Sequence, residues 1–318
     1  MSGNASGAGR LPVLLLTGPT GAGKTDWAIR LAESAPVEIV SVDSALVYRG
    51  LDIGTAKPPH EVRARIPHHL IDICDAAESY SAGRFVSDAL GCIDGIHARR
   101  RVPLLVGGTM LYLRALLDGL AALPEALPEL RRELDRRAAR AGWPALHAEL
   151  ARLDPAAAAR IAPNDAQRIQ RALEVCQATG QPISQLQRAT SSPLASFEVR
   201  YWMLNPPDRA VLHQRLARRL EAMMASGFLD EVRHLRDRGD LTPEHSSMRS
   251  VGYRQLWAHL DGHYDLEEAG RRALAATRQL AKRQLTWMRS ESRGTWLDPA
   301  SELSWNRDIC NGLKALGL

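Results

Sequence analysis

The segment from Gly18 to Thr25 reads GPTGAGKT and has the glycine and lysine spacing of a phosphate-binding loop. Its residues are Gly18, Pro19, Thr20, Gly21, Ala22, Gly23, Lys24 and Thr25. Glycines let the backbone N–H groups curl around an anion, and the following helix adds partial positive charge at its start. Lys24 supplies a point charge for the terminal phosphates, and the hydroxyl of Thr25 suits Mg²⁺. These residues predict a site for a phosphate-bearing small molecule.

Two further polar residues follow apolar segments. Asp43 ends the run VEIVSV at 37–42, where an acid can handle the group-accepting substrate, and Gly107-Gly108-Thr109 closes the run VPLLV at 102–106. A nucleotide-hydrolysing enzyme normally has an acid at such a later strand end to hold Mg²⁺. Its absence favours group transfer from a phosphate-bearing donor over a motor or a switch. The alternatives are that Asp43 caps a turn and that Thr109 caps a helix at 110–118.

The elements that carry these residues alternate between two patterns in the first part of the chain. Short apolar runs predict buried parallel strands, and longer segments with helical spacing follow them. The strands are expected at 11–17, 37–42, 69–73 and 102–106, and the helices at 26–34 and 81–100. This alternation predicts an α/β fold, a P-loop-like parallel sheet flanked by helices.

The pattern changes after residue 120. Prolines separate segments rich in Ala, Leu, Arg and Glu, and no strand signal interrupts them. We expect a disordered tail at 1–10, a core domain at 11–120 and 196–318, and an all-helical insertion domain at 121–195. Within the insertion, helices are expected at 128–140, 144–153, 154–161 and 164–179. After it we expect strands at 197–204 and 294–297, and helices at 208–225, 250–259, 266–289 and 302–315.

Composition excludes several classes of protein. The chain has 318 residues, of which 45% are hydrophobic and 24% charged, as in a soluble enzyme. No apolar run near the N-terminus is long enough to span a bilayer, and no signal peptide is recognisable. The cysteines Cys74, Cys92, Cys176 and Cys310 have no zinc-binding spacing. We therefore expect a cytoplasmic protein with reduced thiols and no membrane contact. We also expect it to be a monomer.

The net charge of +5 is unevenly distributed. Residues 1–120 hold 12 cations and 12 anions, whereas residues 121–318 hold 29 and 24. Compositional bias alone can explain the excess of arginine over lysine. Residues 271–289, however, contain six cations and no acid, and Arg271, Arg278, Lys282 and Arg289 fall within about 40° on a helix. Such a one-sided stripe suits a nucleic-acid backbone.

Four parts of the sequence resemble one family. They are GPTGAGKT (18–25), SVDSALVYRGLDIGTAKP (41–58), LLVGGTMLYLRALLDGL (104–120), and RSVGYRQLW (249–257) with ATRQLAKRQLTWMR (276–289). Together they resemble the bacterial tRNA dimethylallyltransferases, or tRNA isopentenylpyrophosphate transferases, of the IPP transferase family. The resemblance extends from about Leu11 to Trp296, and DIGTAKP is its most specific part.

The resemblance implies a reaction. A dimethylallyl group passes from dimethylallyl diphosphate to N6 of adenosine 37, next to the anticodon, in tRNAs that read codons beginning with U. The phosphate-binding loop then holds the donor's diphosphate, with Mg²⁺ on Thr25, and no nucleoside triphosphate is consumed. The catalytic residues would be Asp43, which takes the N6 proton, and Lys24, Thr109 and Arg219, which stabilise the leaving group. The alternative for Arg219 is a solvated helix face.

The resemblance and the charge pattern together imply contacts with the tRNA anticodon stem-loop. The expected contact residues are Asp43, Ser44, Ala45, Leu46, Thr109, Arg131, Gln167, Arg168, Ile169, Gln170, Arg171, Arg249, Ser250, Val251, Gly252, Tyr253, Arg254, Arg278, Lys282, Arg283, Gln284 and Arg289. At position 46 many family members have Gln, so Leu46 loses an amide that could bind the adenine edge.

Three other interpretations remain. They are an ATP-dependent small-molecule P-loop kinase, an adenylate isopentenyltransferase acting on free AMP or ADP, and a non-catalytic RNA-binding module. The helical insertion and the acid-free segment 271–289 argue against the first two, because small acceptors need no such surface. The third leaves the phosphate-binding loop, Asp43 and Thr109 unexplained.

Overall fold

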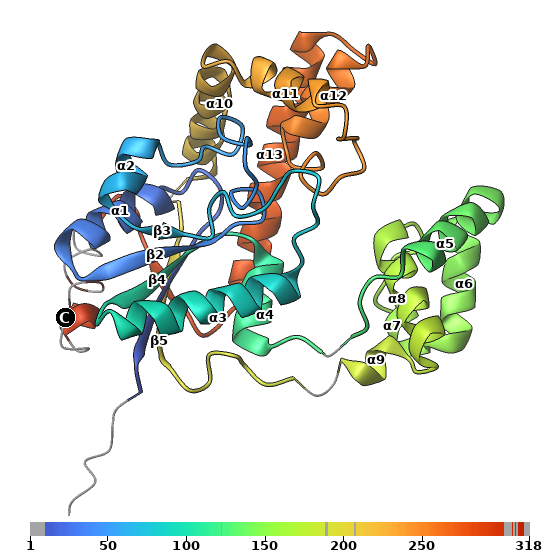
Figure 1. Cartoon of the computed structure of the whole chain (residues 1–318), viewed down its shortest axis with the longest axis horizontal. Helices are drawn as coiled ribbons and strands as arrows, with labels where there is room; N and C mark the ends of the chain where they lie inside the picture. Colours follow the sequence, from blue (N-terminus) through green and yellow to red (C-terminus); the bar gives the residue numbers. More distant parts are fainter. Residues whose placement is uncertain are drawn as a thin grey trace, which may run out of the picture. The chain divides into compact units, whose positions relative to one another are not determined.

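The computed structural model describes residues 10–301 except 122, 188–189 and 207, together with 307, 309 and 311–314. Its strands form one parallel sheet in the order β3-β2-β4-β1-β5-β6, with helices on both faces (Figure 1). The strands are β1 (Pro12–Thr17), β2 (Val37–Val42), β3 (His68–His69), β4 (Val102–Gly107), β5 (Glu198–Leu204) and β6 (Thr295–Leu297). The predicted α/β class, a P-loop-like parallel sheet flanked by helices, is confirmed.

The strand order determines where a ligand can bind. β1 lies between β4 and β5, so the chain leaving β1 passes over β4 to reach β2. In open α/β sheets, ligands bind at the carboxyl ends of the strands where the strand order reverses. Gly107 of β4 is in register with Thr17 of β1 and with Val42 of β2. The phosphate-binding loop, Asp43 and Thr109 therefore all begin at the same level of this edge.

Both faces of the sheet are buried, which explains why its strands are continuous apolar runs. Alternate β1 residues pack in opposite directions: Leu15 belongs to the core that contains Phe85 and Ile93, and Leu14 to the core that contains Trp27 and Leu31. The helices over these faces include α1 (Lys24–Ser34), α3 (Ala82–Ala98) and α4 (Met110–Asp118). All are within two residues of their predicted bounds.

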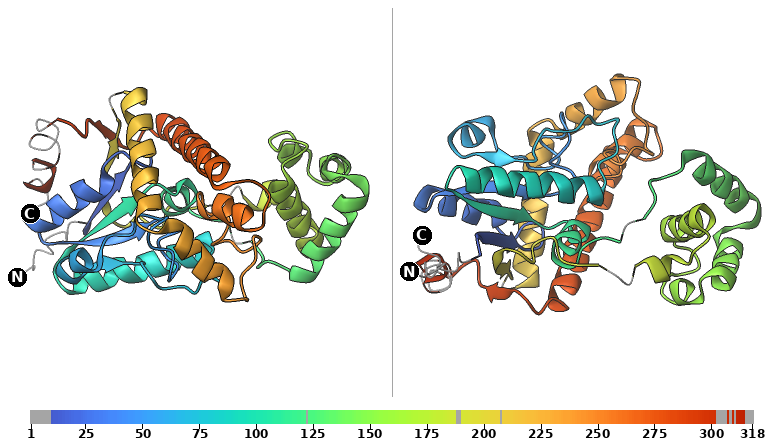
Figure 2. Two further views of the ribbon diagram at one scale, coloured as in Figure 1. Left: turned by 90° about the horizontal axis from the view of Figure 1, so that it is seen from above. Right: turned by 60° about the horizontal axis from the view of Figure 1, so that its bottom comes forward.

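The second part of the α/β unit is mostly helical. α10 (Arg209–Ala225) and α13 (Leu266–Arg289) pack against each other through Leu212, Leu216 and Ala281 (Figure 2). α12 (Tyr253–Leu260) corresponds to the helix predicted at 250–259. Two helices of the α/β unit were not predicted: α11 (Phe228–Asp237) in this part and α2 (His60–Arg65) in the first part. α14 (Asn311–Lys314) lies within the helix expected at 302–315. Most other residues of that helix, most of the predicted tail and Cys310 lie outside the described residues.

The chain divides into two compact units, Met1–Leu117 with Pro193–Leu318, and Asp118–Ser192. The second contains α5 (Pro128–Ala141), α6 (Trp143–Leu153), α7 (Pro155–Ala158), α8 (Ala166–Thr179) and α9 (Ile183–Leu186). Its own core includes Leu134, Leu150, Ile169 and Leu173. None of its described residues forms a strand. We call it the helical unit.

Other expectations concern absences. Among the described residues, no helix combines the length and the apolar character needed to cross a membrane. Cys74, Cys92 and Cys176 are free thiols. The part of the chain that the structure describes contains no group of three His, Cys, Asp or Glu residues that could hold a metal ion.

A candidate active site at the phosphate-binding loop

A cavity of about 500 Å³ opens at the carboxyl edge of the sheet. It is lined by the phosphate-binding loop, the ends of β2 and β4, and residues of α10 and α13. Four charged or polar groups that the sequence singled out lie around it, namely Lys24, Asp43, Thr109 and Arg219. Residues far apart in the sequence are thus brought together in one cavity.

The loop itself is shaped by its glycines. Gly21 and Gly23 have φ angles of 80° and 89°, which residues other than glycine rarely adopt. A Cβ on Gly21 would also lie 2.9 Å from Leu216 Cδ2. Lys24 folds back over the loop, and its Nζ donates to the carbonyl oxygens of Gly18 and Pro19, both at 2.9 Å. The loop therefore has the wound conformation of an anion cradle, with the Lys24 ammonium held against two of its carbonyl oxygens.

Three charged groups influence one another in this cavity. Burial lowers the pKa of Lys24 to about 8, while Asp43 opposes this change and Arg219 adds to it. Burial also lowers the pKa of Arg219, again opposed by Asp43. Arg219 Nη2 donates to the carbonyl oxygen of Thr55 at 3.3 Å. Arg219 therefore faces the cavity and not bulk solvent.

Asp43 is half-buried, and its two carboxylate oxygens have different surroundings. Oδ1 accepts a hydrogen bond from Ala45 N at 2.8 Å and a longer one from Leu46 N at 3.4 Å. Oδ2 has no hydrogen-bond partner among the described residues. The carboxylate thus stabilises the turn after β2 with one oxygen and leaves the other available to a ligand.

The hydroxyl of Thr109 connects the ends of β2 and β4. It accepts a hydrogen bond from Ser44 N at 3.0 Å and donates to Ser44 Oγ at 3.3 Å. Thr109 N also donates to the carbonyl oxygen of Val42 at 3.3 Å. In the described part of the chain, this hydroxyl bonds no N–H group of α4. The partner of the hydroxyl is therefore Ser44, while the carbonyl oxygen of Thr109 accepts hydrogen bonds from Tyr112 N and Leu113 N at the start of α4.

Glu231 of α11 is a residue that the sequence interpretation missed. Its carboxylate accepts hydrogen bonds from the backbone N–H groups of Asp52, Ile53 and Gly54 at 2.9, 2.7 and 3.1 Å. It also accepts one from the hydroxyl of Tyr253 at 2.5 Å. Glu231 thereby joins two segments of the family resemblance, DIGTAKP and RSVGYR, at one side of the cavity. Burial and the Glu231 carboxylate both raise the pKa of Tyr253.

Phe228, also missed, lies between two glycines of the same segments. A Cβ on Gly54 would lie 2.1 Å from its ring, and a Cβ on Gly252 would lie 2.8 Å from it. The glycines were visible in the sequence as a signal of close approach, but the residue that approaches them was not. Phe228 lines the cavity together with Leu220 and Met223. This wall is apolar, in contrast to the loop side.

The predicted RNA-contacting residues of the α/β unit differ in exposure. Arg249, Arg254, Lys282, Arg283 and Arg289 are exposed, and Ser250, Val251 and Arg278 are half-buried. Tyr253 is 0% and Gln284 7% exposed, so both side chains pack inside the protein. On the stripe, Arg271 forms an ion pair with Glu268, an acid just before the acid-free segment. The stripe therefore has fewer free cations than its sequence indicated.

In the helical unit only Gln167 and Arg168 of the predicted contact residues are exposed. Ile169 is 0% exposed and belongs to the core. Gln170 Nε2 donates to Asp135 Oδ1 at 2.7 Å. These positions show that a segment chosen for RNA contact also contains residues that hold its own helices together.

Two predicted RNA-contacting arginines of the helical unit bind a buried acid instead. Glu174 is 0% exposed. Arg131 binds it with Nε at 2.8 Å and Nη2 at 3.0 Å, and Arg171 with Nη1 at 2.6 Å. Although burial raises the pKa of Glu174, hydrogen bonds from Arg131 and Arg171 outweigh it and lower the pKa. Arg131 therefore joins α5 to α8, whereas Arg171 pairs with Glu174 within α8 and donates to the carbonyl oxygen of Pro124 at 2.8 Å.

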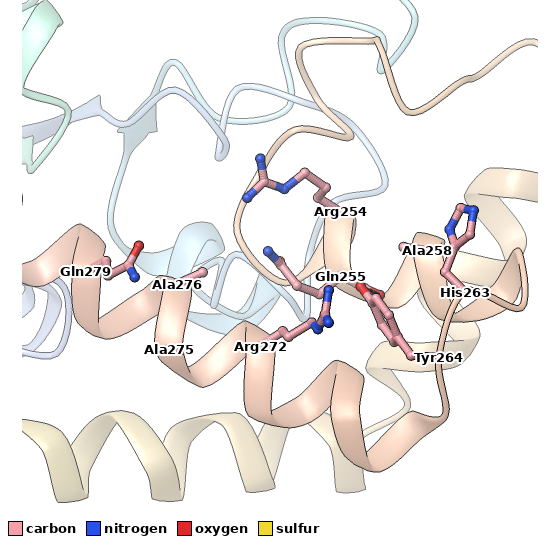
Figure 3. Close-up of a pocket in the computed structure, with 9 residues that line it drawn as sticks. All are labelled: Arg254, Gln255, Ala258, His263, Tyr264, Arg272, Ala275, Ala276 and Gln279. Carbon is pink, nitrogen blue, oxygen red and sulfur yellow. Dashed lines mark hydrogen bonds between the residues drawn. The ribbon is translucent and has the colours of Figure 1, made fainter. Parts of the chain in front are cut away.

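A second hollow of about 550 Å³ lies between α12 and α13 (Figure 3). Arg254 and Gln255 project into it from α12, and Arg272 and Gln279 from α13. The guanidinium of Arg272 lies 4.5 Å from the centre of the Tyr264 ring and binds Glu268. This hollow has no phosphate-binding loop and no free acid, so the cavity at the sheet edge is the candidate active site.

Comparison with known proteins agrees with this geometry. The sequence model of the family described as IPP transferase matches residues 46–291, and that of isopentenyl transferase matches residues 11–66. The chain is 61% identical to the tRNA dimethylallyltransferase of Bordetella petrii, over 88% of this chain and 90% of the relative. It is 60% identical to that of Alkalilimnicola ehrlichii, over 92% of each chain.

Solved structures are similar over nearly the whole length. The tRNA isopentenylpyrophosphate transferase of Bacillus halodurans is 37% identical with a TM-score of 0.70, over 96% of each chain. A eukaryotic dimethylallyltransferase acting on tRNA is 28% identical with a TM-score of 0.77, over 96% of this chain and 78% of the other.

Proposed function

The chain belongs to the IPP transferase family, and from this premise we propose the group it transfers and the atom that receives it. It is a transferase that prenylates tRNA. The donor is dimethylallyl diphosphate, and the acceptor is N6 of adenosine 37 in tRNAs that read codons beginning with U. The products are N6-(dimethylallyl)adenosine and diphosphate.

One observation carries the proposal. A single cavity holds a phosphate-binding loop, an acid with a free oxygen and an apolar wall, and these match the parts of the two substrates. The loop and Lys24 suit the diphosphate. Leu220, Met223 and Phe228 suit the branched five-carbon group, and Asp43 suits an exocyclic amine.

The chemistry assigns a role to each polar group. The N6 amine is a poor nucleophile because its lone pair is delocalised into the adenine ring, so departure of diphosphate must activate the allylic carbon. The bond between C1 and the diphosphate oxygen breaks as the bond between N6 and C1 forms, and Asp43 Oδ2 takes the proton that N6 loses. Lys24, Arg219 and the loop N–H groups stabilise the charge on the departing diphosphate.

Mg²⁺ is the proposed cofactor. Thr25 is exposed and lines the cavity, and the described residues contain no group of three His, Cys, Asp or Glu residues that could hold a metal ion by themselves. Such a site fits Mg²⁺, which keeps several waters and usually binds through substrate phosphates and few protein ligands. When bound, the ion would neutralise part of the diphosphate charge.

The proposed partner is the anticodon stem-loop of the tRNA. A stacked base cannot enter the cavity, so adenosine 37 must be flipped out of the loop. The exposed Arg249, Arg254, Lys282 and Arg289 of the α/β unit, and Gln167 and Arg168 of the helical unit, support contacts with the RNA backbone. We further propose that the protein is a monomer and acts in the cytoplasm.

The experiment combines the purified protein with dimethylallyl diphosphate, Mg²⁺ and unmodified tRNA, followed by nucleoside analysis by mass spectrometry. We expect N6-(dimethylallyl)adenosine in the digested tRNA. Parallel reactions replace the tRNA by AMP or ADP, or the donor by ATP with small acceptors. Prenylation of free AMP but not of tRNA, or ATP turnover without prenylation, would replace the proposal by one of its rivals.

A further inference from the structure

Gln284 is a buried polar residue on α13 whose amide forms a hydrogen bond at its oxygen and another at its nitrogen. Its Oε1 accepts a hydrogen bond from the backbone N–H of Thr20 at 2.9 Å, and its Nε2 donates to the carbonyl oxygen of Gly108 at 2.8 Å. These partners lie 264 and 176 residues away in the sequence. A buried amide held at both ends fixes the relative positions of the groups that it joins.

The fit around Gly108 leaves no room for another side chain. A Cβ at this position would lie 2.6 Å from Gln284 Nε2 and 2.9 Å from the carbonyl oxygen of Gly18. The end of β4 is therefore packed directly between the phosphate-binding loop and α13. Only glycine permits this approach.

The two partners of Gln284 connect to different reacting groups of the proposed site. Thr20 is part of the loop that cradles the diphosphate. Gly108 precedes Thr109, whose hydroxyl binds Ser44 beside Asp43. One side chain therefore sets the separation between the leaving-group side and the acceptor side of the cavity.

The helix that carries Gln284, α13, also has basic residues on its solvent-exposed side. Lys282 and Arg283, on the same turn, are exposed. The same helix packs through Ala281 against Leu212 and Leu216 of α10, the helix that carries Arg219. A polyanion bound to the exposed side of α13 is thus connected to the reacting groups through one rigid element.

We propose that Gln284 is a positioning residue that aligns the diphosphate loop with Thr109 and Asp43, and that registers RNA bound on α13 against that loop. The inference rests on the proposed function. Alignment matters because a misplacement of about 1 Å between reacting groups can slow a reaction on the order of 100-fold. No atom of Gln284 takes part in the bond changes.

Two substitutions separate its contacts. Gln284→Leu removes both hydrogen bonds with little change in volume. Gln284→Glu keeps an acceptor for Thr20 N but cannot donate to Gly108 O, and it places negative charge beside the diphosphate loop. Gln279→Leu is the matched control, because Gln279 is exposed on the same helix. Thermal unfolding verifies that each variant is folded at the assay temperature.

Single-turnover rates, tRNA Kd and the Kd of inorganic diphosphate are measured for each variant. In Gln284→Leu we expect the rate to fall on the order of 100-fold while tRNA Kd changes by less than about threefold. In Gln284→Glu we expect diphosphate Kd to rise at least about tenfold through repulsion. The control should match the wild type in all three measurements.

Other outcomes would overturn the inference. Unchanged rates and diphosphate Kd, with only a lower Tm, would make Gln284 a structural brace. Loss of tRNA affinity without loss of rate would make it an RNA contact. A wild-type protein that prenylates no tRNA, but in which Gln284→Glu still weakens diphosphate binding, would contradict the proposed function and support the contact with the loop.

Discussion

At the scale of single residues, the geometry of Asp43 allows one carboxylate both to stabilise a turn and to accept a proton in the proposed reaction. Its Oδ1 stabilises the turn through Ala45 N, and its Oδ2 remains free toward the cavity. The sequence offered turn capping and proton transfer as alternatives, yet the geometry permits both. The hydrogen bond from Ala45 N holds the carboxylate in one orientation before the substrate binds. A fixed orientation favours proton transfer at a defined position.

Asp43→Asn tests whether the two carboxylate oxygens have separate roles, one in the turn and one in proton transfer. The amide oxygen can still accept the hydrogen bond from Ala45 N, but the amide cannot take a proton. We expect the single-turnover rate to fall by about 10²–10⁴-fold, with tRNA Kd within about threefold of the wild type. Asp94→Asn, at an exposed position of α3, is the control. Weaker tRNA binding at an unchanged rate would make Asp43 a recognition residue.

The lowered pKa of Lys24 predicts that kcat/KM for the diphosphate donor depends on pH. Burial lowers its pKa to about 8, so in the free enzyme the ammonium is charged below that pH and neutral above it. A neutral amine attracts diphosphate less, so kcat/KM for the donor should fall as pH rises above about 8. Bound diphosphate favours the charged form, so kcat should fall only at higher pH.

The control for this prediction is Lys24→Arg, because arginine keeps its charge throughout this range. Its kcat/KM for the donor should be lower than that of the wild type but flat around pH 8. A wild-type pH profile that is also flat from pH 7 to about 10 would show that Lys24 does not titrate in this range.

At the scale of elements, the sequence pattern predicted those strands and helices that are determined by their own residues. Apolar runs located β1, β2 and β4, and the bounds of α13 were correct to the residue. The helix α11 was missed, because its buried side depends on distant segments. Phe228 begins the helix and packs between Gly54 and Gly252, and Glu231 binds backbone groups near residue 53. Such partners cannot be identified from spacing along one chain.

The contact between Phe228 and Gly54 predicts a large effect of one methyl group. Gly54→Ala would place Cβ 2.1 Å from the ring, so packing must shift. We expect the free energy of unfolding to fall by about 1–3 kcal/mol, measured by urea denaturation. Gly91→Ala, in α3 with open space around it, should be neutral or raise stability slightly. Adding Phe228→Leu should recover part of the Gly54→Ala loss, and additive effects would contradict the contact.

The exposed side of α13 predicts the effect of charge reversal. Lys282→Glu should raise tRNA Kd about tenfold at low salt and reduce the slope of log Kd against log salt by about one unit. Arg100→Glu is the matched control, since Arg100 is exposed but precedes β4 at the opposite edge of the sheet. Equal weakening in both variants would indicate an effect of net charge and not a contact at α13.

At the scale of the whole molecule, the sequence predicted where the charge accumulates but not which charges are free. The excess of cations lies after residue 120. Some of these cations are paired within the protein, because Arg131 and Arg171 bind buried Glu174 and Arg271 binds Glu268. Pairing of this kind depends on tertiary structure. The motifs indicated the loop, Asp43 and Thr109, which lie around one cavity. Glu231 became visible only in the fold, and Gln284, predicted as an RNA contact, is buried between the loop and β4.

The most direct test of the account uses two anticodon stem-loop RNAs that differ only at position 37. Each is incubated with the full-length protein, dimethylallyl diphosphate and Mg²⁺. Mass spectrometry then measures the mass of the RNA before and after digestion. We expect one dimethylallyl group on the RNA with adenosine at 37 and none on the RNA with guanosine there. Equal labelling of both, or labelling of neither while free AMP is prenylated, would contradict it.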